Sequence, residues 1–93
     1  MDIFPIETGR VVLSKAGRDS GRYFVVVKVE DDMYAYIADG VLRKLGKPKR
    51  KKIKHLTAKP ELLFAIGEKL LSGKKVFDSE IRSGLLNLGY LKK

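Results

Sequence analysis

The chain has 93 residues, 44% of them hydrophobic, and its 20 Lys and Arg against 11 Asp and Glu give a formal net charge of +9. This length and apolar content fit one small folded domain and argue against a disordered basic tail. The sequence has no cysteine, which excludes disulfide scaffolds, thiolate metal sites and cysteine nucleophiles. No apolar run is long enough for a membrane-spanning helix, and residues 1–9 lack the pattern of a signal peptide, so we expect a cytoplasmic protein.

The first half of the chain has the pattern of short β-strands separated by turn residues, at the spacing of a small barrel. Five strands are expected, at 11–13, 23–29, 34–38, 41–45 and 53–56. The second is β-branched and aromatic throughout, which is typical of a central strand. In the third, Tyr34 and Tyr36 are expected to share one face. The dipeptide Asp39-Gly40 is expected to form the tight hairpin turn that leads into the fourth strand.

After residue 57 the apolar spacing becomes helical. A first helix is expected over 60–72, with Pro60 at its first position, where the fixed φ angle helps and the missing N–H is not needed. Apolar residues then recur every four positions, and Gly73 provides the stop signal. The apolar stripe predicts packing against the strands.

A second helix is expected to begin with its N-cap at residue 78 or 79 and to stop at Gly89. Two short helices could form a DNA-reading helix-turn-helix. The connection between them is long for that motif, however, and the second helix carries a single basic residue, Arg82. Packing against the strands is therefore favoured for this helix as well.

The excess positive charge is concentrated in one stretch, Arg43–Lys59, which we call the basic segment. It contains nine basic residues and no acid, whereas the rest of the chain holds 11 bases and 11 acids. Like charges so close together repel one another, and a polyanion would relieve that repulsion. The run KPKRKK also resembles a nuclear-import signal, but the strand-like IKHL follows directly, which favours a basic loop within a fold.

A second basic site is expected in the hairpin between the first two strands, within GRVVLSKAGRDSGRYFVVVKV. Gly17 and Gly21 bracket its tip, and glycine permits turn conformations that a side chain obstructs. Three cations would project from this tip: Lys15, Arg18 and Arg22.

This glycine-bearing hairpin resembles the KOW motif of small SH3-like barrels in ribosomal proteins and transcription elongation factors. The order GRVVLSKAGRDSGRYFVVV, IADG and KRKKIKHLT resembles the large-subunit ribosomal protein family called fourteen-e, of archaea and eukaryotes, and the short KOW-domain RNA-binding proteins of bacteria. The resemblance covers residues 9–57. It implies an SH3-like (KOW) barrel at 1–58, followed by a helical extension at 59–93 that packs on the barrel.

The resemblance also implies RNA binding through the hairpin loop and the basic connections. The positions that match the family's loop are Lys15, Gly17, Arg18, Gly21 and Arg22. Those that match the basic stretch before the last strand are Lys51, Lys52, Lys54 and His55. The basic segment adds five candidate phosphate contacts: Arg43, Lys44, Lys47, Lys49 and Arg50. Four aromatic residues are candidates for stacking on unpaired bases, although a small barrel also needs aromatic residues inside: Tyr23, Phe24, Tyr34 and Tyr36.

Catalysis has little support in the sequence, and we expect no enzyme, no cofactor and no metal site. The single histidine, His55, has no serine or carboxylate at a motif spacing. Glu30, Asp31 and Asp32 are consecutive, so they cannot converge on one ion, and we interpret them as a solvated turn.

The sequence as a whole predicts a non-enzymatic RNA-binding protein, monomeric when free, that binds ribosomal RNA or the large ribosomal subunit. Ribosomal proteins are possible further partners. Two alternatives stay open: a protein-interaction module whose basic segment meets an acidic protein surface, and a transcription-associated KOW factor. The sequence does not separate a permanent ribosomal component from a factor that visits RNA.

Overall fold

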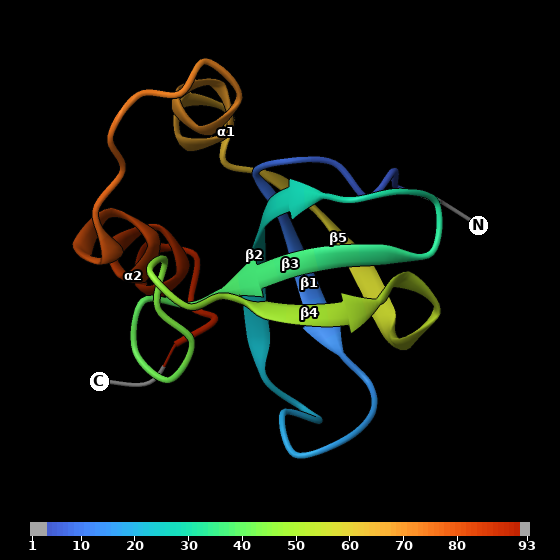
Figure 1. The fold of residues 1–93 in the computed structure, drawn as a ribbon. Helices are drawn as coiled ribbons and strands as arrows, with labels where there is room; N and C mark the ends of the chain where they lie inside the picture. Colours follow the sequence, from blue (N-terminus) through green and yellow to red (C-terminus); the bar gives the residue numbers. More distant parts are fainter. Residues whose placement is uncertain (1–3, 92–93) are drawn as a thin grey trace.

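The computed structural model describes residues 4–91, which form a twisted five-stranded antiparallel sheet followed by two helices (Figure 1). The strands are β1 (Arg10–Ser14), β2 (Tyr23–Val29), β3 (Tyr34–Ala38), β4 (Lys49–Lys52) and β5 (Leu56–Leu62), with a 3-10 turn at Ile53–His55. The helices are α1 (Phe64–Leu71) and α2 (Asp78–Asn87). The predicted class, mainly β with two helices after the strands, is confirmed.

The strand order in the sheet is β4-β3-β2-β1-β5. The first four strands each pair with their neighbour in sequence, and β5 then returns to pair with β1. This places β2 at the centre, as its β-branched sequence predicts, and leaves β4 and β5 as the two edges.

Both faces of β1 and of the first half of β2 are buried, which explains why these stretches are nearly continuous in apolar residues. One face contributes to a core made only by the strands: Val12, Phe24, Val26, Ala35, Ile37 and Leu56. On the other face, side chains from the helices and the α1–α2 connection cover Val11 and Val25: Val76, Ile81 and Leu85, with Leu63, Ile66 and Leu70 partly buried around them. The helices are thus a second layer on one side of the sheet (Figure 1).

Helix α1 approaches the N-terminal segment so closely that only glycine fits at the contact. A Cβ added at Gly67 would lie 2.6 Å from the carbonyl oxygen of Thr8, and one added at Gly9 would lie 2.9 Å from that of Leu63. The Leu63 N–H donates a hydrogen bond to the Gly9 carbonyl at 2.8 Å. Direct backbone contact therefore fixes where the helical part begins.

Helix α2 is tied to α1 through its first turn. Glu80 accepts a hydrogen bond from the Phe77 N–H at 2.9 Å and pairs with Lys69 of α1 at 2.8 Å. The Lys69 ammonium, and next the Phe77 N–H, lower the pKa of the Glu80 carboxyl. The N-cap is Phe77, one residue before the earlier of the two predicted positions, and Gly89, with φ +83°, follows the end of the helix as predicted. Within residues 4–91, neither helix has the length and hydropathy needed to cross a membrane.

The expected fourth strand at 41–45 is wrong, and the strand lies instead at Lys49–Lys52, in the run predicted to be a loop. The reason is a side chain that competes for backbone N–H groups. The Asp39 carboxylate accepts hydrogen bonds from the N–H groups of Val41 and Arg43, both at 2.9 Å, and so bends the chain into a wide loop at 39–48.

The expected bounds of the last strand and the first helix are also wrong. Ile53–His55 is a 3-10 turn, and β5 begins after it and continues past Pro60, where the first helix was expected. Proline is tolerated there because β5 is an edge strand. The Arg10 guanidinium donates hydrogen bonds to the carbonyls of Lys59 and Pro60, at 3.4 and 3.0 Å, where the register of β1 and β5 shifts.

Candidate nucleic-acid interface

Residues 15–22, which join β1 to β2, form a closed hairpin tip. The Gly21 N–H donates to the Ser14 carbonyl at 2.8 Å, and the Ser14 N–H donates to the Arg22 carbonyl at 3.0 Å. Gly17 and Gly21 both have positive φ, +76° and +85°, as their spacing predicts. Three cations of this tip are exposed: Lys15, Arg18 and Arg22.

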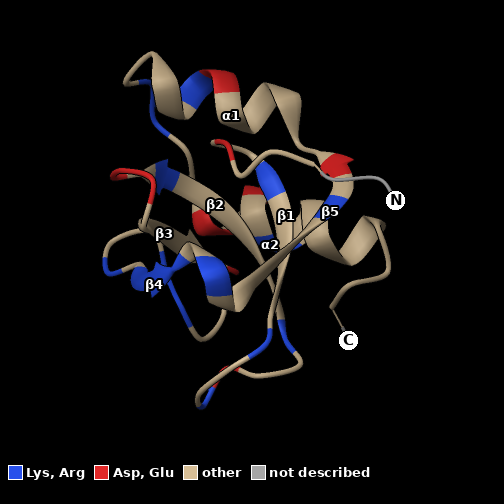
Figure 2. Cartoon of the chain, turned by 90° about the vertical axis from the view of Figure 1, so that its right-hand side faces the viewer, with Lys and Arg blue, Asp and Glu red and all other residues tan. Residues whose placement is uncertain are grey.

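The basic segment runs through the 39–48 loop, β4, the 3-10 turn and the start of β5. Five of its lysines are exposed: Lys44, Lys47, Lys49, Lys52 and Lys54. Figure 2 shows basic residues on β4 and on both arms of the hairpin tip, with acidic residues at the β2–β3 turn. Basic residues from two separate parts of the sequence therefore face solvent.

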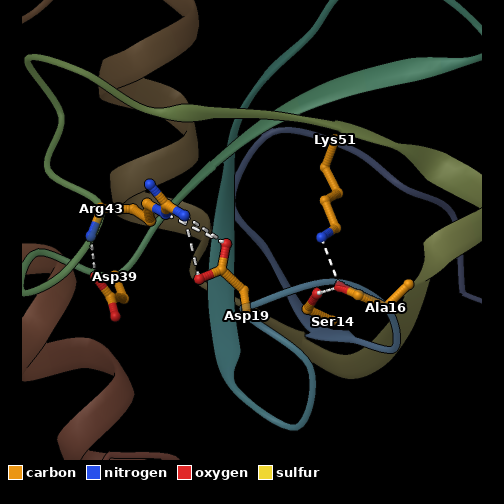
Figure 3. Close-up of polar contacts among 6 residues, drawn as sticks. All are labelled: Ser14, Ala16, Asp19, Asp39, Arg43 and Lys51. Carbon is orange, nitrogen blue, oxygen red and sulfur yellow. Dashed lines mark hydrogen bonds and ion pairs between the residues drawn. The ribbon is translucent and has the colours of Figure 1, made fainter.

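Lys51 joins these two basic regions. It points to the inner side of the sheet and is 9% exposed, and its ammonium donates a hydrogen bond to the Ala16 carbonyl at 2.7 Å (Figure 3). The Ser14 hydroxyl donates to the same carbonyl at 3.3 Å. A Cβ at Gly17 would lie 3.2 Å from the Lys51 ammonium, so this glycine leaves room for the contact. Lys51 was predicted to bind phosphate, but its geometry is that of a residue that positions the hairpin tip.

Arg43 makes a second link between the same regions. Its Nη2 lies 3.1 Å and its Nε 3.2 Å from Oδ2 of Asp19, a hairpin-tip residue whose side chain is 6% exposed (Figure 3). A third link is the hydrogen bond from the Lys15 N–H to the His55 carbonyl, at 2.8 Å. The hairpin tip and the basic segment thus form one continuous region.

Arg50 lies on the outer face of β4 and is also paired. Its Nη2 lies 2.7 Å from Oε2 of Glu30, and its guanidinium carbon lies 3.6 Å from the centre of the Tyr34 ring. The Tyr36 hydroxyl donates to Glu30 at 3.0 Å. The hydrogen bond from Arg50 is the main reason that the pKa of Glu30 is lowered, and the same bond raises the pKa of Arg50. Glu30, Asp31 and Asp32 are all exposed, as expected of a solvated turn, but Glu30 is in addition paired with Arg50.

Besides Tyr36, the three other candidate stacking residues have different environments. Phe24 is fully buried in the strand core, which excludes it as a surface stacking residue. Tyr34 lies beneath Arg50, and Tyr23 stacks on Tyr90 with ring centres 4.2 Å apart and planes at 28°. Tyr90 had no signal in the sequence, because its place depends on how the chain turns after α2.

The single histidine and the acidic residues were the remaining candidates for a chemical role. His55 is half-buried in the 3-10 turn, and in residues 4–91 no group of three or more His, Asp or Glu could hold a metal ion. The exposed cations on the hairpin tip and the basic segment are suited to contact phosphate oxygens. No protein-family model matches the chain.

Proposed function

We propose that the protein is a non-enzymatic RNA-binding protein of the KOW type, an SH3-like barrel with a helical extension, that binds ribosomal RNA on the large subunit. The observation that carries the proposal is the joining of the hairpin tip to the basic segment. Through Lys51–Ala16 and Arg43–Asp19, two basic stretches far apart in sequence form one surface. A continuous basic surface is the electrostatic footprint expected of a nucleic-acid-binding protein.

The contacts of Arg43 and Lys51 give this surface a more defined shape than a lysine-rich loop would have. Arg43 and Lys51 are held by the protein itself, and they tie the 39–48 loop and β4, which carry exposed lysines, to the hairpin tip. The exposed lysines would each neutralise a phosphate and release counterions. Affinity should therefore fall steeply as salt rises.

The experiment measures the affinity of purified large-subunit ribosomal RNA for the protein at several salt concentrations. The variant replaces Lys49 and Lys52 of β4 by Gln, and the matched control replaces Lys74 and Lys75, exposed in the α1–α2 connection, by Gln. Both variants lose the same charge. The β4 variant should bind more weakly and flatten the slope of log K against log salt by about 1 to 2, whereas the control should keep the wild-type slope. Equal slopes in both variants would remove β4 from the interface.

A gradient of cell lysate tests the ribosomal part of the proposal. The tagged protein should migrate with the large ribosomal subunit in low salt and leave it in high salt. If the protein stays at the top of the gradient in low salt, ribosome association is wrong. Co-migration with RNA polymerase would instead favour a transcription-associated factor.

A further inference from the structure

A pocket of about 650 Å³ is enclosed by three parts of the chain: the β1–β2 hairpin, the 39–48 loop and the end of α2. Its main walls are formed by Arg22, Tyr23, Val41, Arg82, Leu86 and Tyr90. Its volume is within the range of pockets that hold small ligands, roughly 300–1,000 Å³. No acidic residue lines it in the part of the chain that the structure describes.

The pocket exists because the chain reverses after α2. The Gly89 N–H donates to the Leu86 carbonyl at 3.0 Å, and the Tyr90 N–H donates to the Leu85 carbonyl at 2.9 Å. This pair of hydrogen bonds, with Gly89 at φ +83°, is the Schellman motif that ends many helices. It returns Tyr90 to the sheet, where its ring stacks on Tyr23.

The stacked tyrosines give the pocket a fixed and neutral aromatic wall. The Tyr90 hydroxyl donates a hydrogen bond to Glu61 at 2.9 Å. Burial, together with this hydrogen bond, raises the pKa of Tyr90 to about 12, so the hydroxyl stays protonated at neutral pH. Beside the tyrosines, Leu86 and Val41 add apolar surface.

Two arginines flank this wall. Arg22 belongs to the hairpin tip and Arg82 to α2, and both are exposed. Arg82 makes a long hydrogen bond of 3.5 Å to the Gly40 carbonyl, and within residues 4–91 neither arginine forms an ion pair. An anionic group at the pocket would therefore meet uncompensated positive charge.

We infer that this pocket holds one unpaired nucleotide of the RNA bound at the hairpin tip, with its base against the tyrosine wall and its phosphate toward Arg22 and Arg82. This inference rests on the proposed function. Arg22 belongs to both sites, so an RNA strand on the hairpin tip reaches the pocket without a break. Aromatic stacking of an unpaired base and arginine contact to its phosphate are the usual means of binding single-stranded RNA.

The test compares two RNA probes, a fully paired duplex without a loop and the same duplex with one extra, unpaired adenosine in one strand. Wild-type protein should bind the second probe about tenfold more tightly, the size expected for one stacked base. Arg82→Glu should abolish this preference. Lys74→Glu, an equal charge change at an exposed position outside the pocket, should change the affinity for both probes by the same factor, if at all, and keep the preference.

Nuclear magnetic resonance gives a second readout that needs no variant. The methyl signals of Val41 and Leu86 should shift on addition of the probe with the unpaired adenosine and stay in place with the paired probe.

Equal affinity of the wild type for both probes, or a preference that survives Arg82→Glu, would overturn the nucleotide pocket and leave the proposed function intact. If neither probe binds, or if the binding of both is independent of salt, the nucleotide pocket and the proposed function are both wrong. Shifts of these methyl signals with polyglutamate but not with RNA would assign the pocket to an acidic protein partner.

Discussion

The turn before β3 and the loop after it use the same hydrogen-bonding device in two environments. In the turn, Asp31 accepts hydrogen bonds from the N–H groups two and three residues farther along, at 2.9 and 2.8 Å. In the loop, Asp39 accepts from the N–H groups two and four residues farther along, both at 2.9 Å. Asp31 is exposed, whereas Asp39 is fully buried and its Oδ2 has no partner in the described chain.

Each region also restrains an arginine of the basic segment. The 39–48 loop contributes Arg43, whose partner Asp19 is almost fully buried, and the turn contributes Glu30, whose partner Arg50 is 47% exposed. Water can replace the contacts of the exposed pair at little cost, whereas the Asp19 carboxylate is too buried for water to replace Arg43 easily. If RNA binds as proposed, we therefore expect Arg50, and not Arg43, to exchange its carboxylate for a phosphate.

The largest predicted effect is at Gly40, where the loop meets α2. Gly40 has φ +79°, and an added Cβ would lie directly against the carbonyl oxygen of Asp78. Gly40→Ala should therefore lower the free energy of unfolding by about 3 kcal/mol, since both the backbone conformation and the contact become strained. Gly46→Ala is the matched control, because Gly46 lies in the same loop with open space around it. Chemical denaturation measures both, and equal midpoints would show that the loop does not depend on its contact with α2.

The two aspartates give the most direct comparison of the two regions. Asp39→Ala should destabilise the protein by about 2 kcal/mol, because two backbone N–H groups lose their acceptor in a place that water reaches poorly. Asp31→Ala should cost about 0.5 kcal/mol, since its N–H groups can bond to water instead. Denaturant unfolding of both variants checks the difference. Equal losses would mean that burial does not separate the turn from the loop.

Strands β2 and β3 could be predicted from the sequence almost residue by residue. The β-branched run at 23–29 matches β2, and the expected strand at 34–38 matches β3. Strand β4 could not be found in this way, because Lys-Arg-Lys-Lys has no strand propensity of its own. It is a strand because it pairs with β3, in a register that places Lys51 opposite Ala35. Pairing across the sheet decided this element, and local sequence did not.

In the candidate site, too, some features follow from local sequence and others depend on the fold. The hairpin tip could be predicted because Gly17 and Gly21 mark positive φ wherever the chain folds. The partners of Arg43 and Arg50 could not, since Asp19 and Glu30 lie 24 and 20 residues away and meet them only in the folded chain. The sequence therefore shows an acid-free basic segment, although the folded protein neutralises two of its arginines.

The smallest predicted effect is the pH dependence of the exposed pair at the turn. Because the hydrogen bond from Arg50 lowers the pKa of Glu30 below its ordinary value of 4.5, the folded protein binds this proton less tightly than the unfolded chain does. The resulting stabilisation is complete above about pH 4.5 and is lost as the pH falls through the lowered pKa. Glu30→Gln should therefore show a shallower fall in melting temperature than the wild type over this acid range, while Asp32→Asn, at an exposed position of the same turn, should follow the wild type. If melting temperature against pH follows parallel curves for wild type and Glu30→Gln, the Glu30–Arg50 pair contributes nothing to stability. A large difference would show that Glu30 behaves like the buried contacts, and the turn and the loop would then not differ.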